Sequence, residues 1–101
     1  MDKHIDKMSI RWENWYVYRI DNTTYQYCCW PPSIGADVQQ KITISIDTDE
    51  SIDFKAEQYF EYSGSGGWDI WTGYEPQLKE TLIEDAKKRI RDINEKLLWE
   101  K

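Results

Sequence analysis

The chain has 101 residues, of which 40% are hydrophobic and 15% aromatic, and its formal net charge is −6 at pH 7. This length suits one domain spanning residues 1–101, and the apolar content argues against a disordered chain. The composition also excludes a membrane span, because no apolar run approaches eighteen residues, and it disfavours direct nucleic-acid binding, which needs a basic patch. Residues 1–10 lack the apolar stretch of a signal peptide, so we expect a cytoplasmic protein.

The first third of the chain predicts two strands. We expect residues 1–8 to be a frayed N-terminus. Residues 9–20, SIRWENWYVYRI, are rich in β-branched and aromatic residues and predict one strand, which a polar turn at 21–24 joins to a returning strand at 25–30. Both sides of the first strand are bulky, which indicates either a central position or a face that meets a partner. The two sets of side chains are Ile10, Trp12, Tyr16, Tyr18 and Ile20 on one side, and Trp15 and Val17 on the other.

Two adjacent cysteines, Cys28 and Cys29, end the second strand. Successive strand residues point to opposite faces, so we expect one buried thiol and one more exposed thiol. Two cysteines cannot form the disulfide framework of a secreted domain, and a bond between neighbours would be strained. We therefore expect both thiols to be reduced.

The middle of the chain shows the clearest strand pattern. Residues 41–46, KITISI, alternate strictly between apolar and polar side chains, and residues 52–62 alternate again after the polar turn 47–51. This pattern predicts a hairpin with one face on the core and the other in water. The inward set is Ile52, Phe54, Ala56 and Phe60, with Gln58 as an exception, and the outward set is Asp53, Lys55, Glu57, Tyr59 and Glu61.

From Pro76 the apolar period becomes helical, which predicts an amphipathic helix over residues 76–99. Its apolar stripe consists of Leu78, Leu82, Ala86, Ile90, Ile93 and Leu97. Together these elements predict an α+β domain: an antiparallel β-meander of four to five strands within residues 9–72, with one long C-terminal amphipathic helix packed on one face.

The glycine-rich stretch 63–76, SGSGGWDIWTGYEP, could be a phosphate-binding loop or a connection. A phosphate loop needs a lysine and a following helix, and neither is present where it should be. We therefore expect a flexible connection between an edge strand and a short last strand, displaying Trp68, Trp71 and Tyr74.

No catalytic or metal-binding signature stands out. The single histidine, His4, lies in the segment expected to be frayed, so nothing positions a base beside a nucleophile. Acidic and hydroxyl residues at 47, 49, 51 and 53 match the first positions of a calcium loop, but Ile52 replaces its glycine and Gln58 its final glutamate. We expect no enzyme activity, no metal and no cofactor.

The acidic excess lies in the middle of the chain. Residues 36–75 carry nine acidic residues and two lysines, a net charge of −7. Our leading hypothesis is a non-enzymatic inhibitor that docks this acidic hairpin and nearby aromatic residues onto a basic, nucleic-acid-binding surface of a partner protein. A virus-encoded anti-defence protein or nucleic-acid mimic would be an example. The candidate contact residues are Asp47, Asp49, Glu50, Asp53, Glu57, Tyr59, Glu61, Trp68, Asp69, Trp71 and Tyr74.

Three alternatives remain open. The acidic residues could serve only to keep a strand edge soluble and unpaired. The surplus of six tryptophans and seven tyrosines could form a self-interface in a homo-oligomeric accessory module. Aromatic rings also stack on sugars, so a carbohydrate-binding module is the second alternative function.

Overall fold

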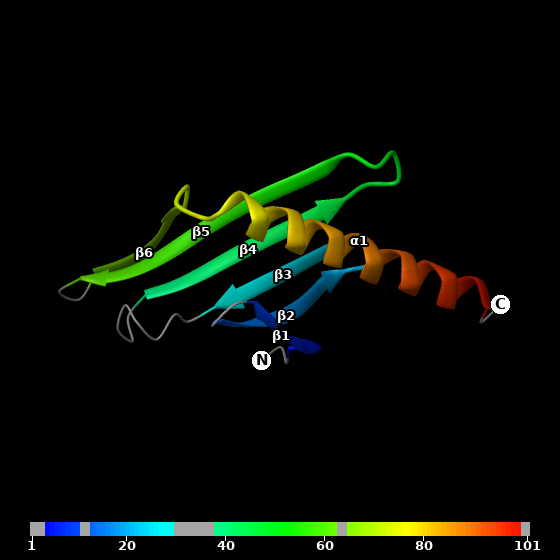
Figure 1. Cartoon of the computed structure of the whole chain (residues 1–101), viewed down its shortest axis with the longest axis horizontal. Coiled ribbons are helices and arrows are strands. Elements are labelled where there is room, and N and C mark those ends of the chain that lie inside the picture. Colours follow the sequence, from blue (N-terminus) through cyan, green and yellow to red (C-terminus); the bar gives the residue numbers. More distant parts are fainter. Residues whose placement is uncertain (1–3, 11–12, 30–37, 63–64, 100–101) are drawn as a thin grey trace.

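In the residues that the computed structural model describes, the chain forms a six-stranded antiparallel sheet crossed on one face by one helix (Figure 1). The structure describes residues 4–10, 13–29, 38–62 and 65–99, with side chains for 4–10, 13–29, 39–59 and 67–95. The strands lie in the sheet in the order in which they occur along the chain, so each one pairs with its sequence neighbour.

The described elements follow one another along the chain in a simple order. They are β1 (Asp6–Ile10), β2 (Glu13–Asp21), β3 (Thr24–Cys29), β4 (Val38–Ile46), β5 (Ile52–Tyr62), β6 (Ser65–Ile70) and α1 (Pro76–Trp99). This arrangement confirms the expected α+β meander with a C-terminal helix, although the sheet has one strand more than the upper expectation.

The helix begins at Pro76 and ends at Trp99, as its apolar period predicts. Leu82, Ala86 and Ile90 are buried against the sheet, and Leu78 and Ile93 pack at the margin of the same core. One apolar stripe therefore holds the helix on the sheet, and the opposite side of the helix stays in water.

The core lies between α1 and one face of the sheet. Its central row runs across four strands through Val17, Tyr27, Ile42 and Ala56, which are paired in register. The first three of these side chains have no exposed area. Among the described residues, the other buried apolar strand positions are Trp15, Tyr25, Cys29, Ile44 and Ile46, and the polar Gln40 is buried as well.

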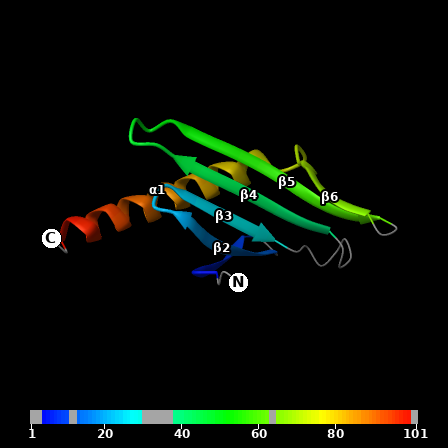
Figure 2. The same ribbon diagram turned by 180° about the vertical axis from the view of Figure 1, so that it is seen from behind.

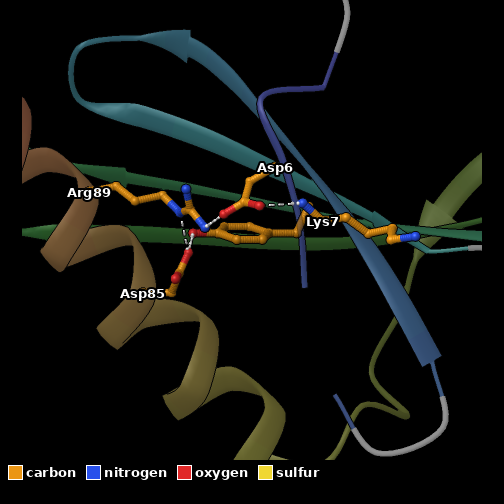
Figure 3. Close-up of polar contacts among 5 residues, drawn as sticks. Asp6, Lys7, Asp85 and Arg89 are labelled. Atoms are coloured by element: carbon orange, nitrogen blue, oxygen red, sulfur yellow. Dashed lines mark hydrogen bonds and ion pairs between the residues drawn. The ribbon is translucent and has the colours of Figure 1, made fainter. Parts of the chain in front are cut away.

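A polar network also joins α1 to the sheet (Figure 3). Arg89 donates from Nε to Asp85 at 2.7 Å and from Nη2 to Asp6 on β1 at 2.8 Å. The buried Tyr27 hydroxyl donates to the same oxygen of Asp85 at 2.7 Å. The network connects the helix to β1 and β3 and gives the buried Tyr27 hydroxyl a charged acceptor.

The N-terminal region corrects two expectations. Residues 6–10, part of which were expected to be frayed, form strand β1, and the predicted strand 9–20 is in fact the end of β1 and most of β2. In a single strand Ile10 would share a face with Tyr16, but the hairpin pairs Ile10 with Glu13. Ile10 therefore lies on the same side as Trp15 and Val17, whereas Tyr16 and Tyr18 remain on the opposite side of β2.

The glycine-rich stretch is the other correction. Ser65–Ile70 is a regular strand, β6, which pairs with β5 from Glu57 to Tyr62. The ladder continues one position further, because the Trp71 N–H donates to the Ala56 carbonyl at 3.0 Å. The expected short last strand is therefore present as β6, but it begins earlier, so that Ser65, Gly66 and Gly67 belong to the sheet and not to a flexible connection.

Candidate functional site

No other described element covers the face of the sheet away from the helix (Figure 2). We call it the open face. Its central row crosses all six strands and is made of Lys7, Tyr16, Cys28, Lys41, Glu57 and Ile70. These side chains lie opposite the core because successive strand residues point to opposite faces.

An aromatic pair lies at the β5–β6 side of the open face. Tyr59 and Trp68 are cross-strand partners with ring centroids 5.3 Å apart. The Lys41 ammonium lies 4.0 Å from the centre of the Trp68 ring, a cation–π contact. Trp68 remains 39% exposed and Ile70 82% exposed, so this part of the surface presents apolar area to solvent.

Glu57 was expected to be one of a row of outward carboxylates, and its environment limits that role. It points to the open face, but its side chain is only 16% exposed. Lys41 lies 3.7 Å and Lys55 3.8 Å from its carboxylate oxygens. Two cations therefore offset its charge, and Glu57 supplies little negative field. The side chain of Glu61 lies outside the described residues.

The exposed carboxylates gather instead at one end of the sheet. The β2–β3 and β4–β5 turns lie side by side there, since the Ile46 N–H donates to the Thr23 carbonyl at 2.9 Å. Both turns carry exposed acidic residues, and we call this group the acidic end. Its members are Asp21, Asp47, Asp49, Glu50 and Asp53.

Local hydrogen bonds fix two of these carboxylates. The hydroxyl and the backbone N–H of Ser51 donate to Asp49 at 2.6 and 3.1 Å and hold the pKa of Asp49 below its ordinary value. The backbone N–H and the hydroxyl of Thr23 do the same for Asp21, at 2.8 and 2.9 Å. Both side chains therefore stay ionised at neutral pH, in fixed orientations.

A groove of about 610 Å³ separates the acidic end from the second half of α1. Asp47 and Glu50 line it from the turn, and Lys87 and Arg91 line it from the helix. The helix thus reduces the negative potential on that side. Asp53 points to the open face, opposite Ser45, and adds its charge there.

The aromatic residues expected to be displayed together fall into two groups. Trp68 lies on the open face, whereas Trp71 and Tyr74 pack against the helix-side core and are partly buried. Tyr74 contacts Trp71 and Phe54, with ring centroids 5.6 and 5.3 Å apart. The two are therefore structural residues, contrary to the prediction that the connection displays them. Asp69 is exposed on the helix side, opposite Gln58.

The neighbouring cysteines lie on opposite faces, as expected. Both are free thiols: Cys29 is buried in the core and Cys28 is half-buried on the open face. Burial raises the pKa of each thiol, and for Cys29 a hydrogen bond to Glu13 at 3.1 Å adds to the effect. Neither cysteine has the low pKa of a reactive thiol.

Within the part of the chain that the structure describes, no three histidine, cysteine or carboxylate side chains gather closely enough to hold a metal ion. In the same residues, no helix has the length and apolar character that crossing a bilayer demands. Comparison with protein families, curated proteins and solved structures found no match to this chain.

Sequence reasoning missed two features of this surface. Asp21 joins the acidic end only because the two turns are adjacent in the sheet, and nothing in the local sequence indicates that. Lys41 lies between Glu57 and Trp68, which requires the β4–β5–β6 register. The alternating pattern of residues 41–46 placed Lys41 on the polar side of its strand. The pattern could not identify the residues that Lys41 contacts on neighbouring strands.

Proposed function

We propose that this protein is a small non-enzymatic binding protein that contacts a basic surface of a partner protein through its open face and its acidic end. The observation that carries the proposal is the one-sided construction of the sheet. The helix covers the core on one face of the sheet. The other face presents an aromatic pair, Tyr59 and Trp68, beside charged residues. Exposed tryptophan and tyrosine are the side chains most enriched in protein-interface hot spots.

The dimensions suit one contact surface. Tyr59 and Asp53 are six positions apart along β5, which is roughly 20 Å at about 3.3 Å per residue. A standard interface covers about 800 Å² on each partner and spans such a distance. The aromatic pair would provide the apolar anchor, and the acidic end would steer a basic partner into place.

The backbone of Glu50 supports a role for its carboxylate. Glu50 has a φ of 67°, in the left-handed region that glycine adopts most readily. A non-glycine residue in this region costs about 1 kcal/mol or more. A glutamate therefore occupies a position where glycine would fit better, which favours a use for its charge.

A basic surface of this kind is typical of proteins that bind nucleic acid, and the carboxylates would then take the place of phosphates. Under this proposal the protein acts as an inhibitor, and duplex DNA or RNA competes with it for the partner. The two free thiols, Cys28 and Cys29, suit a cytoplasmic location, because reducing conditions keep cysteines unpaired.

The test is capture of a partner from extracts of the native host, followed by measurement of its affinity with the purified proteins. The charge-reversed variant Glu50→Lys/Asp53→Lys is compared with Glu80→Lys/Glu84→Lys, which makes the same charge change at exposed positions of the helix. We expect the first variant to weaken binding at least about tenfold, since each reversal removes an attraction and adds a repulsion. The helix variant should bind like the wild type.

Ionic strength provides the second readout. The affinity should fall as salt rises through the range where the Debye length drops from about 10 to 3 Å. Equal losses in both variants, or an affinity indifferent to salt, would contradict the electrostatic part of the proposal. Trp68→Ala tests the aromatic part separately, and unchanged affinity in that variant would exclude Trp68 as an anchor.

A further inference from the structure

The two edges of the sheet differ in character. Strand β1 carries the charged residues Asp6 and Lys7. Arg89 of the helix forms an ion pair with Asp6, so this edge is charged and is bonded to the helix. Among the described strands, β6 pairs with β5 alone, and its sequence, SGGWDI, contains one charged residue and no proline. Charges and prolines are the usual protection of an edge against another strand, so β6 is the less protected edge.

The alternation of hydrogen bonds along β6 determines which backbone groups are unpaired at this edge. The Trp71 N–H donates to the Ala56 carbonyl, so residues 71, 69, 67 and 65 direct their peptide groups toward β5. Peptide groups alternate along an antiparallel strand. Gly66, Trp68 and Ile70 therefore direct their N–H and C=O groups away from the sheet, toward the free edge.

We propose that β6 pairs antiparallel with β6 of a second copy of this chain, with Trp68 on the two-fold axis. In this register Trp68 faces Trp68 of the second copy, and Gly66 faces Ile70. Every outward peptide group of one strand then meets an outward group of the other, which is the self-complementarity that a two-fold interface requires. The six-stranded sheets would join into one continuous sheet of twice the width.

The side chains fit the same register. On the open face, the exposed Ile70 of each copy lies beside glycine and Trp68 of the other, so the two most exposed apolar side chains of β6 are covered together. On the helix side, Asp69 lies opposite Gly67 of the second copy. Asp69, the one charged residue of β6, therefore does not face Asp69 of the second copy. This favours the register, because like charges directly opposite one another destabilise a strand pair.

Neither steric contact nor backbone conformation within one copy requires a glycine at position 67. A Cβ at this position would meet no atom within 4 Å, and its φ lies outside the left-handed region. In the proposed pair it faces Asp69 of the second copy. Position 67 can therefore be substituted to test the pairing while the fold of each copy is kept.

The experiment measures mass by light scattering and sedimentation equilibrium, with no partner protein present, at about 0.15 M salt so that the net charge of each copy is screened. The wild type should have about twice the chain mass of 12.2 kDa at high concentration. Gly67→Asp places a new carboxylate opposite Asp69 of the other copy, at two symmetry-related places. It should weaken the dimer at least about tenfold, since like charges opposite one another repel. The double variant Gly67→Asp/Asp69→Lys makes both pairs attractive and should restore the dimer.

Thr72→Asp is the matched control, because it adds the same charge at an exposed position beyond β6 and should leave the dimer intact. Circular dichroism and unfolding confirm that each variant is folded. A monomeric wild type would overturn the inference, as would equal dimerisation of wild type and Gly67→Asp, or failure of the double variant to restore the dimer. This inference does not rest on the proposed partner binding, which is measured separately with a purified partner.

Discussion

Arg89 on α1 reaches Asp6 on β1, with the arginine Nη2 atom 2.8 Å from the Oδ2 atom of the aspartate. These residues are 83 positions apart, and their contact holds the edge strand β1 against the helix (Figure 3). Arg89 is also bonded to Asp85, which accepts from Tyr27. One guanidinium thus connects the first strand, the third strand and the helix.

We expect Arg89→Met to lower the free energy of unfolding by about 2 kcal/mol, because the half-buried carboxyl of Asp85 then loses its guanidinium partner. Urea unfolding at neutral pH measures this loss. Lys88→Met on the exposed side of the same turn is the control and should cost under about 0.5 kcal/mol. The Arg89 hydrogen bond also lowers the pKa of Asp6. The stability that this pair contributes is therefore fully present above the ordinary aspartate pKa, and it is lost as pH falls through the lowered pKa. Equal losses of unfolding free energy in Arg89→Met and Lys88→Met would show that the network does not stabilise the fold.

Tyr27→Phe should cost about 1 kcal/mol at neutral pH, because a buried hydrogen bond to a charged acceptor is lost. Burial, together with the bond to Asp85, raises the pKa of Tyr27 well above its ordinary value. The folded chain then keeps a proton that the unfolded chain releases near pH 10, so wild-type stability falls above that pH, by about 1.4 kcal/mol per unit from this residue. The phenylalanine variant should lose stability less steeply in alkali. Parallel curves of unfolding free energy against pH would contradict this assignment.

A thiol reagent should distinguish the two cysteines. Cys28 is half-buried with a raised pKa, so it should react more slowly than a free thiol, and the buried Cys29 should react only on unfolding. Absorbance of the released reporter follows both phases. Cys28→Ser should remove the first phase and Cys29→Ser only the second. Simultaneous reaction of both thiols in the folded protein would be inconsistent with their placement on opposite faces.

The two tryptophans that follow the glycines should behave differently. Trp71→Ala removes a ring packed on the core and should cost about 2–3 kcal/mol, below the cost of truncating a fully buried tryptophan. Trp68→Ala on the open face should cost under about 1 kcal/mol, since its ring is already partly in water. Denaturant midpoints of the two variants give the comparison. A larger loss for Trp68 would reverse the assignment of structural and surface roles.

Glu50→Gly should stabilise the protein by roughly 0.5–1 kcal/mol, because glycine adopts the left-handed conformation of this turn without the penalty of a Cβ. Thermal unfolding measures the gain, and Glu50→Ala is the control that removes the same charge but keeps the Cβ. The alanine variant should not gain stability from relief of backbone strain. Equal melting temperatures for the two variants would show that charge, and not conformation, sets the effect.

Local patterns in the sequence determined the helix and the central hairpin. The period of the apolar residues after Pro76 and the strict alternation of KITISI each depend on side chains a few positions apart, so they can be read without knowing any partner. The same is true of the opposite orientations of Cys28 and Cys29. The α+β meander with its C-terminal helix follows from these patterns.

Only the tertiary structure decided which surfaces are available. Register paired Ile10 with Glu13, placed Lys41 between Glu57 and Trp68, and brought Asp21 beside the β4–β5 turn. Packing of the chain before the helix partly buried Trp71 and Tyr74 against the core, while Trp68 stayed on the open face. The physical reason is that the exposure and charge balance of a side chain depend on neighbours from other strands, whose distance along the sequence carries no local signal.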